Sequence, residues 1–203
     1  MTRKKKSAGA AQAVMKLDKA AHEAVRPYQG SGAVEALTWY AKLGDQPQML
    51  TLSSLVLASG LARGDSRMAR AGLRMIAAHL VATGAKNFVK RRVDRTRPRS
   101  AAGENGHKPR LGRTDTKEET SFPSGHSAGA IAVARAFARE YPEYRGPALA
   151  AAGAIALAQI PRCAHYPTDV GAGLAIGWAS EAAVARLWPD APPGFDPAQR
   201  QES

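Results

Sequence analysis

The sequence predicts an all-α protein, and two features of its 203 residues lead to that expectation. Alanine is the dominant residue, and the alternation of Val, Ile and Thr that is typical of strands is nearly absent. Apolar residues recur instead at helical spacing, in segments that are interrupted by glycine or proline. A chain of this length builds one domain with a full hydrophobic core.

The predicted helices follow one another along most of the chain. They cover residues 15–26, 33–43, 46–62, 67–93, 123–140, 147–160 and 167–187. Pro123 and Pro167 each suit the first turn of a helix, because the N–H group that proline lacks would have no partner there. The connection 99–121 is long for a compact domain, so we expect it to be either disordered or a functional lid.

Both ends of the chain are predicted to stay outside the folded domain. Residues 1–12 carry a basic run, and residues 189–203 are too rich in proline to pack. We therefore expect disordered tails on either side of a single helical domain that covers residues 13–188.

The net charge of +12 predicts an anionic partner. Nucleic acid, an anionic membrane surface and a phosphorylated substrate are the classes that fit. The single Cys163 excludes an intramolecular disulfide and a Cys-rich zinc site. Residues 7–15 are too short and too polar for a signal peptide. The longest charge-free windows, 46–62 and 146–161, fall short of the ~18 apolar residues of a membrane span, so composition favours the buried helices of a bundle.

A basic motif ends the helix that is predicted over residues 67–93. In the stretch KRRVDRTRPRS, Lys90 is followed after six residues by Arg97 and Pro98. Arginine presents a planar fork that grips two phosphate oxygens, and lysine supplies a compact charge. Taken alone, the motif also fits a basic helix end that complements the helix dipole.

The stretch SFPSGHS places a histidine where a helix is expected to begin. With Pro123 in the first turn, the amides of Ser124 and Gly125 point outward at the positive end of the helix, where an anion binds readily. Gly125 lets the backbone approach closely, and the Ser124 hydroxyl adds a donor. His126 then stands beside the bound anion, although a lone histidine is more often structural.

The stretch PRCAHYPTDVGAG repeats this arrangement at the last helix. His165 comes just before Pro167, and Asp169 lies in the first turn. The Asp169 carboxylate can accept a proton from His165, which fixes the imidazole tautomer and makes the other nitrogen a better nucleophile. An ordinary acidic helix start explains Asp169, but it does not explain His165 and Arg162 beside it.

Together, these three motifs resemble the signature motifs of the type 2 phosphatidic acid phosphatase (PAP2) superfamily. That superfamily includes bacterial acid phosphatases, lipid pyrophosphate phosphatases and vanadium haloperoxidases. The resemblance covers about residues 45–187 and implies a bundle of about six helices with the active site at one end. The third motif departs from the family pattern, because only Cys163 and Ala164 separate Arg162 from His165, where the family has five residues.

The resemblance further implies a metal-independent phosphatase that needs no cofactor. His165 would attack phosphorus to form a phosphohistidine, and Asp169 would orient it. His126 would protonate the leaving oxygen and then activate water. The phosphate oxygens would be held by Lys90, Arg97, Ser124, Gly125 and Arg162.

Three other functions stay open on the sequence alone. A vanadate-dependent haloperoxidase would use the same pocket, a basic helical protein could bind nucleic acid, and a decayed phosphatase could bind phosphate or lipid without catalysis. We expect the phosphatase, acting on a phosphorylated lipid of the phosphatidic acid or undecaprenyl pyrophosphate type or on a small phosphoester, without a nucleic acid partner. We also expect association with a bacterial-type inner membrane, with a soluble cytoplasmic location as the alternative. The sequence does not determine the oligomeric state.

Overall fold

The computed structural model describes residues 2–101, 108–114, 116 and 118–188, with side chains from residue 12 onward. The prediction of an all-α fold is confirmed, because in this part of the chain the strands β1 (Val93–Asp94) and β2 (Arg110–Leu111) form only a short antiparallel ladder. The helices are α1 (Thr2–Val25), α2 (Gly32–Ala41), α3 (Gln46–Arg63), α4 (Ser66–Lys90), α5 (Gly125–Glu140), α6 (Arg145–Leu157) and α7 (Pro167–Leu187).

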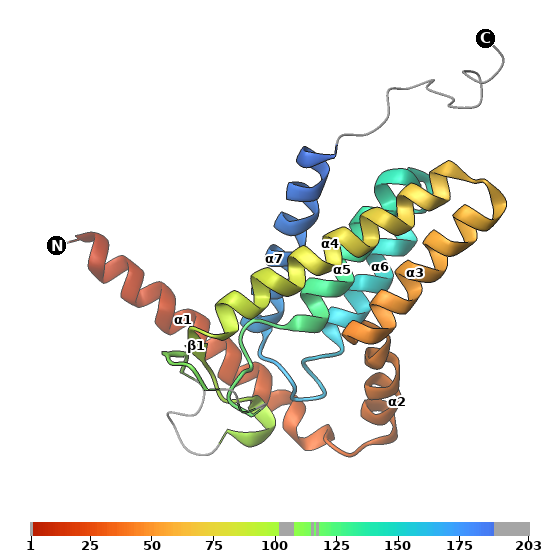
Figure 1. Ribbon diagram of the computed structural model, residues 1–203. Helices are drawn as coiled ribbons and strands as arrows, with labels where there is room; N and C mark the ends of the chain where they lie inside the picture. The colour runs from red at the N-terminus through yellow and green to blue at the C-terminus, as the bar shows by residue number, and fades with distance from the viewer. Residues whose placement is uncertain (1, 102–107, 115, 117, 189–203) are drawn as a thin grey trace, which may run out of the picture.

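Helices α3 to α7 form a bundle in which α5 occupies the centre (Figure 1). α5 packs against α4, α6 and α7. Its sequence is rich in alanine and glycine, and nearly all of residues 127–138 are buried, because small side chains let the neighbouring helices approach. Larger side chains from the surrounding helices complete the core, among them Met49, Met75, Ile155 and Val184.

Glycines on α7 permit its closest contacts with α5. A Cβ atom at Gly173 would overlap the carbonyl oxygen of Ser124, and one at Gly177 would overlap that of Ala128. A larger residue at either position would push the two helices apart. The two helix starts that carry the predicted histidines therefore lie next to each other at one end of the bundle.

Helices α3 and α7 begin where the sequence predicts, α2, α4 and α6 begin one or two residues earlier, and the starts of α1 and α5 differ for reasons that the structure shows. α1 begins at Thr2 and runs through most of the segment 1–12, which the sequence predicts to be disordered. α5 begins at Gly125, and not at Pro123, because the side chain of Ser124 caps the helix by accepting from the Ser127 amide.

The end of α4 also differs from the prediction. The helix ends at Lys90 instead of residue 93, because Val93 and Asp94 pair with residues of β2 on the far side of the connection. The predicted tail over residues 189–203 lies outside the described residues and stays a prediction.

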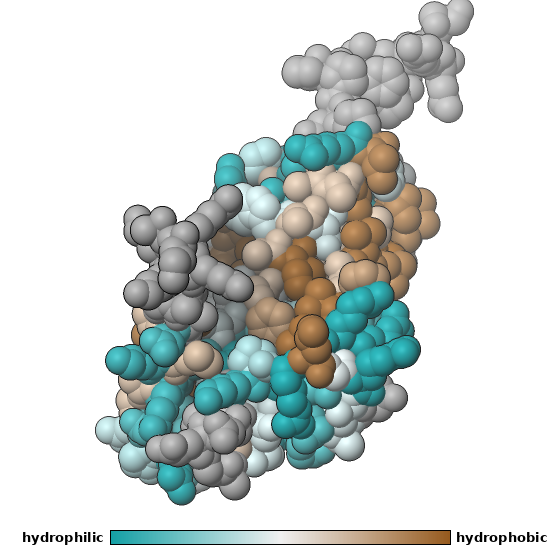
Figure 2. Space-filling model, turned by 90° about the vertical axis from the view of Figure 1, so that its left-hand side faces the viewer, coloured by the Kyte–Doolittle hydropathy of each residue, from teal (hydrophilic) through white to brown (hydrophobic). Residues whose placement is uncertain are grey.

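The bundle has a hydrophobic flank, which appears on one side of the face drawn in Figure 2. The outward face of α4 contributes exposed apolar side chains at Leu73, Leu80, Val81 and Phe88. Within the residues that the structure describes, no helix combines the length and the hydropathy that crossing a bilayer requires.

Candidate active site

A cavity of about 450 Å³ lies at the end of the bundle where α3 and α5 begin and α4 ends. Five of the eight predicted site residues line it: Lys90, Arg97, Gly125, His126 and His165. Three side chains of α4 that the sequence did not single out, His79, Thr83 and Lys86, line it as well. So does Asp45, just before α3.

His165 lies in the turn before α7 and is almost completely buried, with 2% of its surface exposed. Burial lowers the pKa of His165 to about 4, and the charges of Arg97 and Lys90 add to this effect while Asp169 opposes it. The ring is therefore neutral at neutral pH. A neutral imidazole has a lone pair on one nitrogen, which is the form that a nucleophile requires.

Asp169 is fully buried near this ring and is held by hydrogen bonds. Its carboxylate accepts hydrogen bonds from the Tyr166 amide (2.9 Å), the Ser121 hydroxyl (2.5 Å) and the Arg95 guanidinium (2.6 Å). Burial alone would raise the pKa of Asp169, but the contact with His165 and the charge of Arg95 outweigh it and lower the pKa. The carboxylate is therefore ionised.

The contact between Asp169 and His165 is longer than the sequence predicts. The distance from Nδ1 of His165 to Oδ2 of Asp169 is 3.7 Å, beyond the range of a hydrogen bond. Three other donors already occupy the carboxylate. In this structure Asp169 acts on the His165 imidazole through its negative charge. The Nδ1 atom of His165 faces the Asp169 carboxylate.

Lys90 is the last residue of α4, and Arg97 lies in the extended segment that follows the helix. Lys90 donates to the Thr120 carbonyl, and Arg97 donates to the carbonyl of Ala164, next to His165. Burial lowers the pKa of Lys90 to about 7, and the neighbouring charge of Arg97 adds to the shift. Lys90 is therefore a cation whose charge depends on pH near neutrality.

The returning limb of the connection 99–121 holds this segment in place. The amides of Arg95 and Arg97 donate to the carbonyls of Glu119 and Glu118, at 2.7 and 2.8 Å. The part of the connection that the structure describes thus supports the cationic wall of the cavity, whereas the sequence predicted disorder or a lid.

The start of α5 presents its backbone to the cavity. The first amides of a helix have no acceptor within the helix, so the Gly125 amide is available to an anion. Ser124 is fully buried, its amide donates to the Asp169 carbonyl (3.0 Å), and its hydroxyl accepts from Ser127 (2.9 Å). The structure thus places the Ser124 hydroxyl in the helix cap and not at the cavity wall.

His126 has a carboxylate partner that the sequence motif did not reveal. Its Nε2 atom lies 2.8 Å from Oδ1 of Asp45, the residue before α3. Burial lowers the pKa of His126 to about 4, Asp45 opposes the shift, and Arg162 and Arg97 reinforce it. Asp45 resembles an ordinary helix-capping residue in the sequence, so no local signal identified it.

Arg162 lies outside the cavity wall in the described structure. Its guanidinium donates to the Gln159 side chain (3.0 Å), three residues earlier. The shortened motif is closed by a tight turn, in which Cys163 has a left-handed φ of 47° and the amides of Ala164 and His165 both donate to the Gln159 carbonyl. Because of this turn, His165 lines the cavity, whereas Arg162 lies outside the cavity wall.

Together, the fold and this cavity define a helical-bundle protein with a basic pocket that is lined by three histidines and suits a tetrahedral anion. Residues 71–192 match the PAP2 superfamily, and the chain belongs to that family. The family predicted from the three motifs, that of PAP2-type phosphatases, is thus confirmed. Over the described residues, no group of three or more His, Cys, Asp or Glu side chains could hold a metal ion.

Two curated relatives are lipid A 1-phosphatases, from Rhizobium etli and Rhizobium johnstonii. Each is 47% identical over 57 residues, which is 28% of this chain. The match spans only about a quarter of the length of these relatives, 25% and 23%.

Two solved structures share the fold over most of the chain. The transmembrane PAP2-type phosphatidylglycerolphosphate phosphatase from Bacillus subtilis has a TM-score of 0.60 at 21% identity, with 86% of each chain covered. LpxE from Aquifex aeolicus has a TM-score of 0.57 at 18% identity, covering 81% of this chain and 92% of that one.

Proposed function

We propose that the protein is a metal-independent phosphatase that hydrolyses a lipid phosphate monoester or pyrophosphate through a phosphohistidine. One observation carries the proposal: His126 and His165 line the same cavity, together with Lys90 and Arg97. Two neutral imidazoles beside two cations suit a phosphoryl transfer without a metal. One ring attacks phosphorus, the other transfers the proton, and the cations stabilise the phosphate charge.

The first step forms a bond between His165 and phosphorus. Since Nδ1 faces Asp169, the attacking atom is Nε2. The bond between phosphorus and the leaving oxygen breaks, and the electron pair stays on that oxygen. The imidazole becomes positively charged, and the ionised Asp169 stabilises it.

His126 supplies the proton to the leaving oxygen. A bound phosphate dianion raises the pKa of His126 by adding negative charge beside the ring, and Asp45 favours the protonated form in the same direction. In the second step His126 takes a proton from water, the water oxygen bonds to phosphorus, and the bond from phosphorus to His165 breaks.

The negative charge of the transition state sits on the equatorial oxygens of the phosphoryl group. Lys90, Arg97 and the Gly125 amide are placed to stabilise it from the cavity wall. We assign supporting parts to Ser124, which caps the helix that presents Gly125, and to Arg162, whose charge acts on His126.

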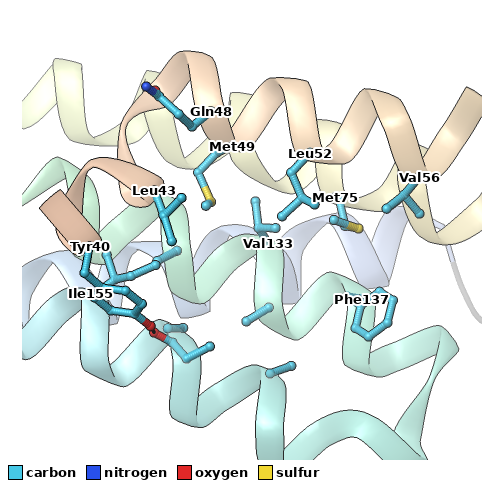
Figure 3. A pocket seen from close by; sticks show the side chains of 15 residues that line it. Tyr40, Leu43, Gln48, Met49, Leu52, Val56, Met75, Val133, Phe137 and Ile155 are labelled. Carbon is cyan, nitrogen blue, oxygen red and sulfur yellow. Dashed lines mark hydrogen bonds between the residues drawn. The ribbon is translucent and has the colours of Figure 1, made fainter.

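A lipid leaving group is supported by a second cavity, of about 630 Å³, with an almost wholly apolar wall. It lies between α3, α5 and α6, where side chains such as Met49, Leu52 and Val133 point into it (Figure 3). Gln48 lines both cavities, so the apolar one adjoins the phosphate site. The names of the relatives, which are phosphatases of lipid A and of phosphatidylglycerolphosphate, point to the same substrate class.

We further propose that the chain works at a bacterial inner membrane. The exposed apolar stripe on α4, with Leu80 and Phe88 about half exposed, is suited to contact with lipid. The solved relative from Bacillus subtilis is described as transmembrane. Washing the membrane fraction with carbonate tests the strength of this association, and a chain found only in the soluble fraction would contradict it.

The function is tested by phosphate release from a panel of lipid and soluble phosphoesters in the presence of EDTA. We expect activity in the wild type, loss of activity in His165→Ala, and a milder deficit in Arg162→Ala. Full activity in the His165 variant would overturn the assignment of the nucleophile. Tight phosphate binding without turnover would instead favour a non-catalytic binder, to which the position of Arg162 outside the cavity wall also points.

A further inference from the structure

The cavity is lined by polar side chains to which the proposed reaction assigns no contact with the phosphoryl group. His79, Thr83 and Lys86 follow one another along α4 at intervals of four and three residues, and Lys90 continues the series. This spacing keeps the side chains on one face of a helix. All of them line the cavity, so we call His79, Thr83 and Lys86 the α4 polar row.

Lys86 is a cation without a carboxylate partner among the described residues. It lies against the start of α5, with Nζ 3.4 Å from the position that a Cβ atom would take at Gly125. Burial lowers the pKa of Lys86. A partly buried cation of this kind is costly unless an anion neutralises it.

His79 stands at the far end of the row and is 2% exposed. Neither ring nitrogen has a hydrogen-bond partner within the described structure. Its Cε1 atom lies 2.9 Å from the Cβ position at Gly129, so the ring packs against the backbone of α5. A buried polar ring without partners loses stability that a bound ligand would restore.

The position of Lys86 relative to Lys90 suits a neighbouring phosphate. The two residues are one helical turn apart, about 6 Å along α4. Lys86 lies beside Gly125, which directly precedes His126, the residue assigned to the leaving oxygen. Within the α4 polar row, Lys86 is thus the member that lies toward His126 and the leaving oxygen.

We propose that the α4 polar row is a second anion subsite, which binds a phosphate carried by the leaving group, so that the substrate is a diphosphate ester. This inference rests on the proposed function. His165 attacks the terminal phosphorus, and the bond from that phosphorus to the bridging oxygen breaks. The bridging oxygen keeps the electron pair and leaves on a monophosphate, whose charge Lys86 stabilises.

The test compares two substrates with the same lipid chain, farnesyl diphosphate and farnesyl phosphate, using the full chain. We expect Lys86→Met to lower the ratio of kcat/KM for the diphosphate to kcat/KM for the monophosphate by about ten- to a hundredfold, because one charge-assisted contact is lost. Thr83→Val should lower the ratio by about two- to tenfold. Lys16→Met removes the same charge from an exposed position on α1 and should leave the ratio unchanged.

An equal loss for both substrates, or no loss for either, would overturn the second subsite while leaving the proposed function intact. If the wild type releases phosphate neither from these two substrates nor from the wider panel, the proposed function fails, and calorimetry then tests the subsite separately. We expect methylenediphosphonate to bind at least tenfold more tightly than inorganic phosphate, and Lys86→Met to abolish the difference. Equal affinities in the wild type would overturn the subsite.

Discussion

Arg95 joins the N-terminal helix to the carboxylate beside His165. Its Nη2 atom lies 2.5 Å from Oδ2 of Asp18 on α1, and its Nη1 atom lies 2.6 Å from Oδ1 of Asp169. Asp18 also accepts from the Thr168 amide at 3.1 Å. α1 is thus anchored, through a buried network, to the first turn of α7.

Asp18→Ala should lower the free energy of unfolding by about 3 kcal/mol, because Arg95 keeps Asp169 but loses its second buried carboxylate, and the Thr168 amide and hydroxyl lose their acceptor. Arg95 is only 3% exposed, so water cannot replace the lost carboxylate. Thermal unfolding should show a Tm lower by about 6–12 °C.

The neighbouring Lys19→Ala is the matched control for this experiment. Lys19 forms an exposed ion pair with Glu23 at 3.8 Å, of the type worth less than about 1 kcal/mol. The network would be refuted if Asp18→Ala and Lys19→Ala unfolded at the same temperature.

Asp45→Asn should reduce kcat by about 10²–10³-fold for an alkyl phosphate, because His126 loses the carboxylate that favours its protonated form. p-Nitrophenyl phosphate has a leaving group that needs little proton donation. We therefore expect a much smaller loss with this substrate, measured on the same enzyme preparation.

The comparison of leaving groups separates a role in proton transfer from a structural role. A general disturbance of α3 would slow both reactions to the same extent. Equal losses for the alkyl and p-nitrophenyl substrates would therefore contradict the role of Asp45 in positioning and charging His126.

The starts of α3 and α7 were predictable from the proline in the first turn of each, whereas Pro123 and Pro147 did not mark the first residues of α5 and α6. The segment predicted over residues 167–187 coincides with α7, and Pro47 lies in the first turn of α3, as predicted. The end of α4 was not predictable, because it depends on the pairing of Val93 and Asp94 with β2, which is distant in the sequence. Local propensity carries no information about such a partner.

The candidate site was predictable where residue types recur at a characteristic spacing, as for Lys90, Arg97, His126 and His165. Asp45 was missed because it looks like an ordinary helix cap, and Lys86 because it looks like an ordinary helix residue; only the packing of α3, α4 and α5 brings them to the cavity. Arg95 was hidden in a basic run, and its importance follows from buried partners on two other helices.

Lys90→Arg should shift the basic limb of the pH profile of kcat/KM to higher pH. With the pKa of Lys90 near 7, the wild type loses the cation as the pH rises, so kcat/KM should fall about tenfold per unit above that value. Arginine stays protonated throughout this range. Both enzymes use the same substrate, whose own ionisation near pH 6 cancels in the comparison. Coincident basic limbs in profiles from pH 5 to 9 would show that Lys90 does not control the descent.

The stability of the protein should fall as the pH falls from about 6.5 to about 4, and His165 should account for part of this loss. Its pKa is about 4 in the folded state, against 6.5 for an ordinary histidine, so in this window the unfolded chain binds a proton that the folded chain does not. The loss of stability that His165 causes is nearly absent above pH 6.5 and reaches about 2 kcal/mol at pH 5.

His165→Asn removes this titration and should therefore weaken the pH dependence, whatever its effect on absolute stability. We expect the drop in Tm between pH 7.5 and pH 5 to be about 4–8 °C smaller in the variant than in the wild type. The variant should keep some pH dependence, because burial also lowers the pKa values of His126 and His79. An identical drop in both proteins would contradict the lowered pKa of His165. It would mean that the ring is hydrated in the folded state and takes up a proton as an ordinary histidine does.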